Sequence, residues 1–262
     1  MRWHTMRTTR RTTWLPTLTL ALMVVAIAGC GLPFNGVFHT PQTLAQNGGV
    51  RLTLEVACPA TDTHCTIAAQ MQNEISILTQ RAQNGLGIAD ASVKRLDATH
   101  IQVDLPGTQN TPRVADVLAK RGQIDILDTG DQILPVGQMV QPGAYPVVFT
   151  GAQIDPNSVT VTVDANTRQG GTGQPIVTFA FQGSARQAFA DYTEQHISQS
   201  LTIALDNVII ESTTIQSQID GQAQITGLGS QTNAQALAAY LKSRPLPLPV
   251  VVVSETYIQP TH

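Results

Sequence analysis

Asp128-Thr129-Gly130 is the stretch of this sequence that comes closest to a known catalytic motif, and it follows the apolar pair Ile126-Leu127. Aspartic proteases place an Asp-Thr-Gly after an apolar strand, so that two copies can share one proton between their carboxylates. Here there is one copy, and Asp131 follows where that motif has a small residue. A homodimer would supply a second copy, but a turn that ends a strand explains these residues better.

A glycine-rich stretch, Gly170-Gly171-Thr172-Gly173, has the composition of a phosphate-binding loop. Such a loop needs a strand before it, a helix after it and usually a lysine. A strand-like run, Pro175–Phe181, follows it instead. We therefore expect a hairpin turn between Val159–Val163 and Pro175–Phe181.

Ser184 and His196 are the remaining candidates for nucleophile and base. Ser184 lies in Gly-Ser-Ala-Arg, which is not a nucleophile elbow, and Gln187 three residues later predicts a capping box that begins a helix. His196 follows on the apolar face of that helix and is predicted to be a partly buried structural histidine. We predict no enzyme activity, no catalytic residue, no cofactor and no metal site.

The N-terminal 29 residues are typical of a targeting segment. Four arginines precede a short apolar run, Leu18–Ile27, and Ile27-Ala28-Gly29-Cys30 resembles the bacterial lipobox. We expect cleavage before Cys30 and attachment of fatty acyl chains such as palmitate to that residue, which would anchor the protein to the cell membrane on its extracytoplasmic face. The alternative is an uncleaved signal anchor with an incidental cysteine, and the shortness of the apolar run argues against it.

Cys58 and Cys65 are then the only thiols left, and we expect a disulfide between them in this compartment. His64 beside Cys65 raises zinc as an alternative. However, the other histidines are scattered and form no second close pair of ligands, so zinc is disfavoured.

The composition is that of a folded protein with an acidic mature chain. Of 262 residues, 42% are hydrophobic and 13% are charged. Removing residues 1–29 leaves 11 basic against 18 acidic residues, a formal charge of −7. This charge disfavours nucleic acid as a partner, because binding to phosphates demands a basic face.

The hydrophobic periodicity that follows Asn47 alternates between strands and helices. Strands are predicted at Val50–Ala57, Ala91–Asp97, His100–Leu105, Gln123–Leu127, Pro175–Phe181 and Val250–Val253, and helices at Ile67–Ala82 and Pro112–Lys120. A helix with the apolar face Ala185, Ala188, Phe189, Tyr192 and His196 follows Gly183. Leu201–Ile210 carries Asp206-Asn207 in its middle, which predicts either two short strands or a bulge. Thr232 with Gln235 is expected to cap a last helix with the apolar face Ala234, Leu237, Ala238 and Leu241.

Five sequence segments resemble, in this order, the extracytoplasmic head of the SecD family, which assists protein export: VTFAFQGSARQAFADYT, LTIALDNVIIES, QIDGQAQITG, AQALAAYLKS and LPLPV. Upstream, the glycine pair Gly48-Gly49, the strand-ending Leu105-Pro106-Gly107 and Phe149-Thr150-Gly151-Ala152 are similar to family positions. The resemblance covers Gly48 to Pro249. Asp206, Gly221 and Gly227 lie within these segments and are expected to hold structural positions of the family.

The resemblance implies an α+β fold with a ferredoxin-like base subdomain and an inserted α+β head. Domain boundaries are expected as follows: signal peptide 1–29, tether 30–48, base 49–130 plus 248–258, and head 131–247. The strand at Gln123–Leu127 ends the first part of the base, and Val250–Val253 returns to it after the head.

The resemblance also implies a function in binding. We expect a membrane-anchored protein that assists translocation by binding unfolded or translocating polypeptide, through a cleft between base and head, together with the Sec translocon. Exposed strand edges and apolar surface would serve that binding. The family's proton-conducting helices have no counterpart after Val253, so we expect no coupling to a proton gradient by this chain itself. The alternatives are a lipoprotein of the same fold that binds another envelope protein or ligand and, more remotely, an envelope hydrolase.

Overall fold

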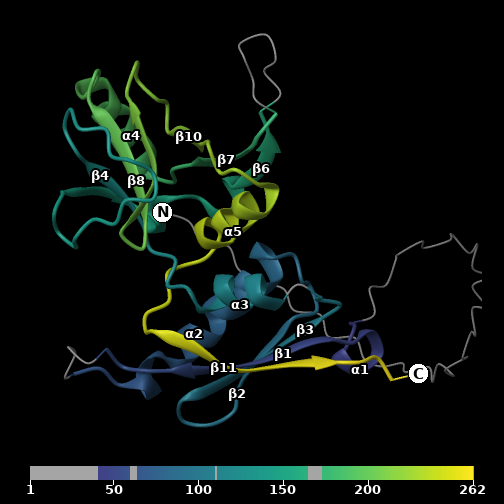
Figure 1. The fold of residues 1–262 in the computed structure, drawn as a ribbon. Coiled ribbons are helices and arrows are strands. Elements are labelled where there is room, and N and C mark those ends of the chain that lie inside the picture. The colour runs from purple at the N-terminus through teal and green to yellow at the C-terminus, as the bar shows by residue number, and fades with distance from the viewer. Residues whose placement is uncertain (1–40, 60–63, 110, 165–172, 262) are drawn as a thin grey trace, which may run out of the picture. The chain divides into compact units, whose positions relative to one another are not determined.

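The computed structural model describes residues 41–59, 64–109, 111–164 and 173–261 (Figure 1). The predicted signal peptide, Cys30 and Gly170–Thr172 lie outside these residues. Three antiparallel sheets and five α-helices are found in the described part of the chain. The α+β class predicted from the sequence is confirmed.

One sheet has four strands in the order β11-β1-β3-β2, and we call this sheet with helices α1, α2 and α3 the base. The elements are α1 (Leu44–Asn47), β1 (Gly49–Val56), α2 (Ile67–Gln80), β2 (Ser92–Arg95), β3 (His100–Pro106), α3 (Thr111–Ala119) and β11 (Val250–Ile258). All three strand pairings are antiparallel. The order strand, helix, strand, strand, helix, strand is consistent with the predicted ferredoxin-like base, with β11 as its last strand.

The base core forms because β1 alternates. Val50, Leu52, Leu54 and Val56 are buried, and they share one cluster with Leu78 of α2 and Leu118 of α3, among others. The intervening residues of β1 are partly or fully exposed. This is the period-two pattern of a sheet with one buried face.

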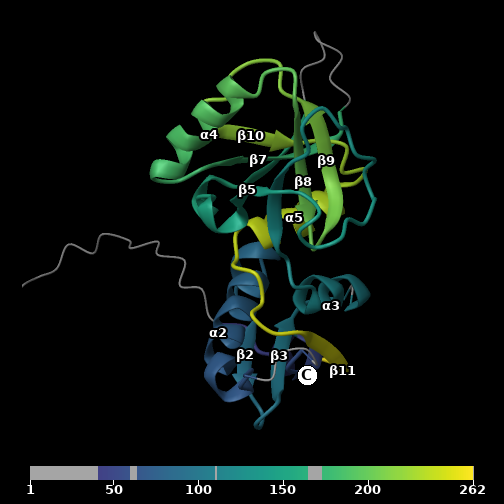
Figure 2. The same cartoon turned by 90° about the vertical axis from the view of Figure 1, so that its left-hand side faces the viewer.

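The other two sheets, with helices α4 and α5, form what we call the head (Figures 1 and 2). One sheet has the order β5-β4-β8-β9 and the other β10-β7-β6. The elements are β4 (Ile124–Asp128), β5 (Val147–Thr150), β6 (Thr160–Val163), β7 (Pro175–Ala180), α4 (Ser184–Gln195), β8 (Ser200–Leu205), β9 (Val208–Thr214), β10 (Gln222–Ile225) and α5 (Gln231–Leu241). The short 3-10 helices η2 (Gly151–Gln153) and η3 (Pro156–Ser158) lie between β5 and β6.

Both head sheets and both head helices contribute to one core. Phe149 of β5 and Phe189 of α4 have ring centroids 5.3 Å apart, and Phe181 lies 4.4 Å from Phe189. Leu201 and Ile203 of β8 and Ile225 of β10 belong to the same buried cluster. Edge-to-face and tilted aromatic pairs of this kind add to the apolar burial that holds the two sheets together.

The hairpin of β8 and β9 confirms the first of the two alternatives predicted for Leu201–Ile210, two short strands. Asp206 and Asn207 both have positive φ, 50° and 65°. Leu205 pairs with Val208, so Asp206 and Asn207 form a two-residue loop, for which positive φ at both positions is the favoured geometry. The Asp206 carboxylate also accepts hydrogen bonds from the backbone N–H groups of Gly122 (3.0 Å) and Gln123 (2.7 Å), which fixes the entry to β4.

Three expectations from the sequence are wrong in position. Strand β4 pairs with β5 and β8, so it lies in a head sheet and not with the base strands as expected for Gln123–Leu127. Residues 44–47, assigned to the tether, form α1, in which Leu44 is buried. The last helix is capped by Ser230, whose side chain accepts from the backbone N–H of Asn233, and not by Thr232.

Helix α4 also begins differently from the prediction. Its N-cap is Gly183, with φ 57°, and Ser184 is the first helical residue and makes no capping hydrogen bond. A glycine adopts this φ at no steric cost, which moves the helix start one residue earlier. On the apolar face Ala185 and Phe189 are buried as predicted, whereas Ala188 is exposed and Ala190 is buried in its place.

Candidate functional site

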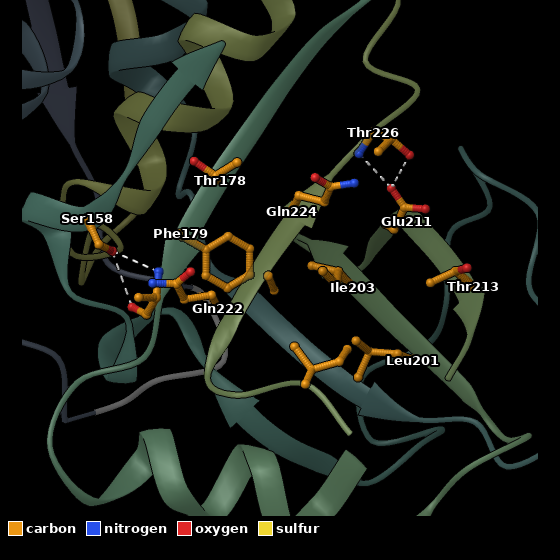
Figure 3. Close-up of a pocket in the computed structure, with 13 residues that line it drawn as sticks. Ser158, Thr178, Phe179, Leu201, Ile203, Glu211, Thr213, Gln222, Gln224 and Thr226 are labelled. Carbon is orange, nitrogen blue, oxygen red and sulfur yellow. Dashed lines mark hydrogen bonds between the residues drawn. The ribbon is translucent and has the colours of Figure 1, made fainter. Parts of the chain in front are cut away.

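A groove lies in the head, where the edge of β10 faces the β8–β9 sheet (Figure 3). Its volume is about 610 Å³. The β8–β9 sheet contributes Leu201, Ile203, Glu211 and Thr213. The opposite wall comes from β7 and β10 and from the segment before β10, with Phe179, Ile219, Ala223 and the polar side chains Thr178, Gln222, Gln224 and Thr226, together with Ser158 and Ala180.

The groove has an apolar floor under a polar rim. Leu201 and Ile203 of β8 and Phe179 of β7 line the groove and are almost completely buried, so we take them as its floor. Amides and hydroxyls of Gln222, Gln224 and other lining residues surround it. An apolar concavity with a few polar groups at its edge is the usual form of a binding site.

The backbone of β10 presents an unpaired edge to this groove. In the sheet order β10-β7-β6, β10 is an outer strand. The N–H of Phe181 donates to the carbonyl of Gly221 (2.9 Å), and these residues are opposite each other in the register. Because hydrogen-bonded and non-hydrogen-bonded pairs alternate in antiparallel sheets, Ala223 and Ile225 bond to β7, while the N–H and C=O groups of Gln222 and Gln224 point away from β7.

Glu211 of β9 occupies the next position along this edge. Its Oε2 accepts hydrogen bonds from the backbone N–H of Thr226 (2.8 Å) and from the Thr226 hydroxyl (3.1 Å), as Figure 3 shows. Thr226 has the same parity as Gln222 and Gln224, so its N–H also points away from β7. The carboxylate therefore bonds to β10 where the carbonyl of a further strand would bond.

A smaller cavity of about 360 Å³ lies where α3 meets α5 and β9. Its lining includes Arg113, Asp116 and Lys120 from α3 and its C-terminal end, and Leu237 and Tyr240 from α5. The cavity lies between a helix of the base and elements of the head, and its use as the expected binding cleft stays a prediction. The groove in the head is the larger of the two and has the unpaired strand edge, which makes it the stronger candidate.

Arg81 is the first residue of the π-helix η1 (Arg81–Gly85). It binds the two chain segments that connect base and head, residues 120–122 and 243–246. Its guanidinium donates to the carbonyls of Lys120, Arg121 and Arg244, and to the hydroxyl of Ser243. The side chain is fully buried and lies over the Tyr240 ring, 5.3 Å from its centroid. Burial lowers the pKa of Arg81 to about 10, so the group stays charged at neutral pH.

The catalytic candidates of the sequence are not brought together. Asp128 is the last residue of β4, and its carboxylate accepts from the N–H of Gly130 (3.0 Å), as expected where a turn ends a strand. Ser184 and His196 lie at opposite ends of α4, about 18 Å apart at 1.5 Å per residue. A nucleophile and its base must be within hydrogen-bond reach, so these two residues form no such pair.

His196 has a structural role. Its Nδ1 lies 2.7 Å from the carbonyl oxygen of Tyr192, and its ring stacks on the Tyr192 ring with centroids 4.0 Å apart. The side chain is partly buried, as predicted. Burial, with the nearby charge of Asp128, raises the pKa of Tyr192 to about 12, so its hydroxyl stays neutral.

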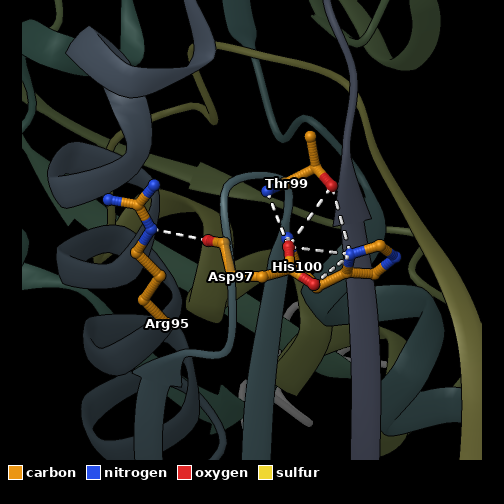
Figure 4. A network of polar contacts seen from close by, with 4 residues as sticks. All are labelled: Arg95, Asp97, Thr99 and His100. Atoms are coloured by element: carbon orange, nitrogen blue, oxygen red, sulfur yellow. Dashed lines mark hydrogen bonds and ion pairs between the residues drawn. The ribbon is translucent and has the colours of Figure 1, made fainter.

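Asp97 and His100 form a carboxylate–histidine pair in the β2–β3 hairpin (Figure 4). Oδ1 of Asp97 accepts from the backbone N–H groups of Thr99 and His100, both at 2.8 Å, and lies 2.9 Å from His100 Nδ1. The Thr99 backbone bond, followed by the bonds to His100, lowers the pKa of Asp97 to about 2. Nδ1 of His100 faces both the carboxylate and the Thr99 hydroxyl, whereas a catalytic relay divides these partners between the two ring nitrogens. The cluster closes a turn.

The cysteine pair forms the predicted disulfide. Cys58 and Cys65 are joined, with their Cα atoms 5.8 Å apart. Among the residues that the structure describes, no group of three or more His, Cys, Asp or Glu side chains could hold a metal ion. No helix in this part of the chain is both long and apolar enough to cross a bilayer.

Of the family-like glycines, Gly48 and Gly49 lie where the backbone of another segment approaches closely. Gly48 and Gly49 have φ values of 63° and 131°, and a Cβ on Gly49 would lie 2.3 Å from the carbonyl oxygen of Leu105. Gly49 pairs with Pro106, and the N–H of Gly107 donates to the carbonyl of Gly48 (3.1 Å), so the two predicted motifs meet. In the head, a Cβ on Gly221 would lie 2.2 Å from Cγ of Arg186, whereas Gly227, with φ 64°, faces open space.

Two family models match the chain. A model of the SecDF P1 head subdomain matches residues 137–248, and a model of the N-terminal part of the protein translocase subunit SecDF P1 domain matches residues 71–130. The chain belongs to the SecD/SecDF family. The two SecD models together cover more than half of it and divide it near the β4–β5 loop.

Individual SecD proteins agree with this assignment. The protein translocase subunit SecD of Dictyoglomus turgidum is 26% identical over 239 residues, which cover 91% of this chain and 54% of the relative. That of Aquifex aeolicus is 26% identical over 201 residues, or 73% of this chain and 40% of the relative. The chain thus spans about half of the length of these relatives, or less.

Solved structures show the same fold. A crystal structure of SecDF in a super-membrane-facing form has a TM-score of 0.65 at 22% identity, covering 82% of this chain and 31% of SecDF. A second structure, of a membrane component SecDF that enhances protein export, has a TM-score of 0.60 at 23% identity and covers 78% of this chain and 98% of that structure. The α+β arrangement of base and head is therefore that of the SecDF P1 region.

Sequence reasoning missed the residues of the groove. The alternation Gln222-Ala223-Gln224-Ile225 indicates a strand with one exposed face. It does not say which edge of that strand is unpaired, because pairing partners come from distant parts of the chain. Glu211 belongs to no sequence motif, so nothing in the sequence pointed to it.

Proposed function

We propose that this chain assists protein translocation on the extracytoplasmic side of the membrane by binding emerging polypeptide in extended form. The observation that carries the proposal is the unpaired β10 edge above the apolar floor of the groove. A segment beside β10 would bond to the free N–H and C=O groups of Gln222 and Gln224. Its side chains would alternate between Leu201 and Ile203 on one side and the polar rim on the other.

Family membership supports the same function, because the relatives are translocase subunits. Main-chain hydrogen bonding suits a partner of variable sequence, since every residue except proline offers one donor and one acceptor. The apolar floor adds affinity for the hydrophobic segments that an unfolded chain exposes. Sec translocon subunits are the expected neighbours of such a protein in the membrane.

We further propose that Cys30 carries fatty acyl chains that hold the protein at the membrane. Labelling of cells with a fatty acid analogue should mark the wild-type chain and leave a Cys30→Ser variant unmarked. Equal labelling of both would remove the lipid anchor from the proposal and leave the groove unaffected.

Photocrosslinking in intact cells tests the binding function. A photoreactive residue at position 224 faces the groove, and one at position 187, on the exposed surface of α4, is the matched control. The proposal expects position 224, and not 187, to capture many unrelated exported proteins. Capture of one recurrent envelope partner would favour the alternative of a different binding task. No capture above the control would contradict the proposal.

A further inference from the structure

Glu211 differs from every other residue of the groove in one respect. Of the lining residues, all of which belong to the described part of the chain, it alone has a charged side chain. Twelve neighbours provide apolar atoms, amides or hydroxyls, so nothing in the lining neutralises the carboxylate. The one formal charge that the lining carries is therefore negative.

Only one oxygen of Glu211 is used by the fold. Oε2 accepts both hydrogen bonds from Thr226. Oε1 has no hydrogen-bond partner among the described residues, and an ionised carboxylate has acceptor capacity for several donors. The bonds to Thr226 hold the side chain in place, so Oε1 is a positioned acceptor at the end of the β10 edge (Figure 3).

Lysine and arginine side chains complement such an acceptor. An ammonium or guanidinium group forms a charge-assisted hydrogen bond with a carboxylate, whereas a second carboxylate is repelled and loses hydration without gaining a partner. The backbone of the bound segment bonds to Gln222 and Gln224, which fixes which of its residues lies opposite Thr226. The preference should therefore apply to one position of the segment and not to its overall charge.

We infer that Glu211 gives the groove a charge preference: it favours extended segments with lysine or arginine at the position beside Thr226 and disfavours aspartate or glutamate there. This inference rests on the proposed function, since it assigns a substrate preference to the same groove. Because Glu211 is only partly buried, water screens the contact. We expect a change from lysine to glutamate at that position to weaken binding roughly fivefold.

Fluorescence anisotropy with labelled peptides tests this directly. The probes are nine-residue peptides of alternating valine and threonine in which each position in turn is lysine, glutamine or glutamate. They are titrated with the full chain, kept in solution by a mild detergent. At one position of the series, wild-type protein should bind the lysine peptide best and the glutamate peptide worst. Salt at 0.5 M should reduce this difference, because the Debye length falls to roughly 4 Å and the charges are screened.

Variants separate the carboxylate from the general charge of the protein. Glu211→Gln keeps an acceptor for Thr226, so it should bind the peptides but no longer distinguish lysine from glutamate. Glu211→Lys should reverse the order. Glu255→Gln, which removes an exposed charge from β11, should behave as wild type.

The outcomes distinguish this inference from the proposed function. Equal binding of the three peptides at every position, or discrimination that persists in Glu211→Gln, overturns the charge preference and leaves polypeptide binding intact. Failure of all peptides to bind overturns both.

Discussion

The carboxylate of Glu74 on α2 accepts a hydrogen bond from the backbone N–H of Leu248, 2.7 Å away and 174 residues later in the chain. Glu74 is completely buried, and its Oε2 has no partner among the described residues. The bond joins the first helix of the base to the segment that returns from the head. An ionisable group therefore lies at the contact between α2 and the segment that leads into β11.

Glu74 should make the stability of the protein depend on pH. Burial raises its pKa from 4.5 to about 7, and the Leu248 bond and the charge of Arg81 oppose this only in part. Because the folded state binds the proton more tightly than the unfolded chain, stability from this group is complete below about pH 4.5 and declines as the pH rises through 7. The full change is about 3 kcal/mol. Urea unfolding between pH 4.5 and 8 should show that the free energy of unfolding declines for wild type and stays level for Glu74→Gln. An equal decline in both would contradict this assignment.

Arg81 should be irreplaceable by lysine. An ammonium group cannot donate in the several directions in which the guanidinium donates to Lys120, Arg121, Ser243 and Arg244. Arg81→Lys should leave buried carbonyls without donors and lower the free energy of unfolding by about 3 kcal/mol. Arg95→Lys, on the exposed β2–β3 hairpin, is the control and should change it by less than about 0.5 kcal/mol. Chemical denaturation measures both, and a loss under 1 kcal/mol for Arg81→Lys would count against the role proposed for it.

The two glycine motifs that meet in the base should respond differently to a methyl group. At Gly49 the φ of 131° and the contact with the Leu105 carbonyl leave no room for a Cβ, so Gly49→Ala should destabilise by about 3 kcal/mol or more. Gly107 has φ 72°, but no atom lies within 4 Å of the place that a Cβ would occupy, so Gly107→Ala should lose about 1 kcal/mol. Thermal unfolding of the two variants shows which loses more stability. Equal losses would show that the positive φ alone, and not the contact with Leu105, determines the cost of the methyl group.

The disulfide should contribute through the unfolded chain. Joining Cys58 to Cys65 closes a short loop, which on the chain-entropy model stabilises by about 2–3 kcal/mol. The double variant Cys58→Ser/Cys65→Ser and reduced wild type should lose this amount alike. If reduction changes stability and the double serine variant does not, the effect comes from something other than loop closure.

Proline substitution in β10 can separate binding from folding. The N–H of Gln224 points away from β7, so Gln224→Pro removes a donor for an added strand and keeps the β7–β10 ladder. Ala223→Pro removes a ladder donor instead and should destabilise the head. We expect Gln224→Pro to weaken peptide binding at least fivefold, which is a loss of roughly 1 kcal/mol in binding free energy. The melting temperature should change little. Unchanged binding by this variant would mean that the peptide does not pair with β10.

Local patterns predicted most of the elements. Asp206-Asn207 predicted the break in Leu201–Ile210 because both residues tolerate positive φ, and the apolar spacing of α5 predicted its buried face. Wrong caps at Ser184 and Thr232 arose where a neighbouring Gly183 or Ser230 began the helix earlier. Such shifts of one or two residues depend on local competition between caps.

Pairing between distant strands could not be predicted in the same way. The alternation of Ile124–Asp128 is the same whether β4 joins the base or the head, and only the complete fold selects β5 and β8 as its partners. The groove depends on that choice too, because it forms between two sheets. Glu74 and Arg81 did carry a signal: with Met71 and Leu78 they follow the three- and four-residue spacing of the buried face of α2 and its π-helical end.

The position of β11 bears on the order in which the chain folds. All head strands lie between Ile124 and Ile225, a continuous segment, whereas β1 acquires its second neighbour only when residues 250–258 have been synthesised. In the complete fold the N–H of Leu246 lies 2.9 Å from the carbonyl oxygen of Arg121, so the ends of the inserted segment lie side by side. A folded head therefore converts a very long loop into a short one and lowers the entropy lost when β11 joins β1. The head is thus expected to act as the folding template for the base.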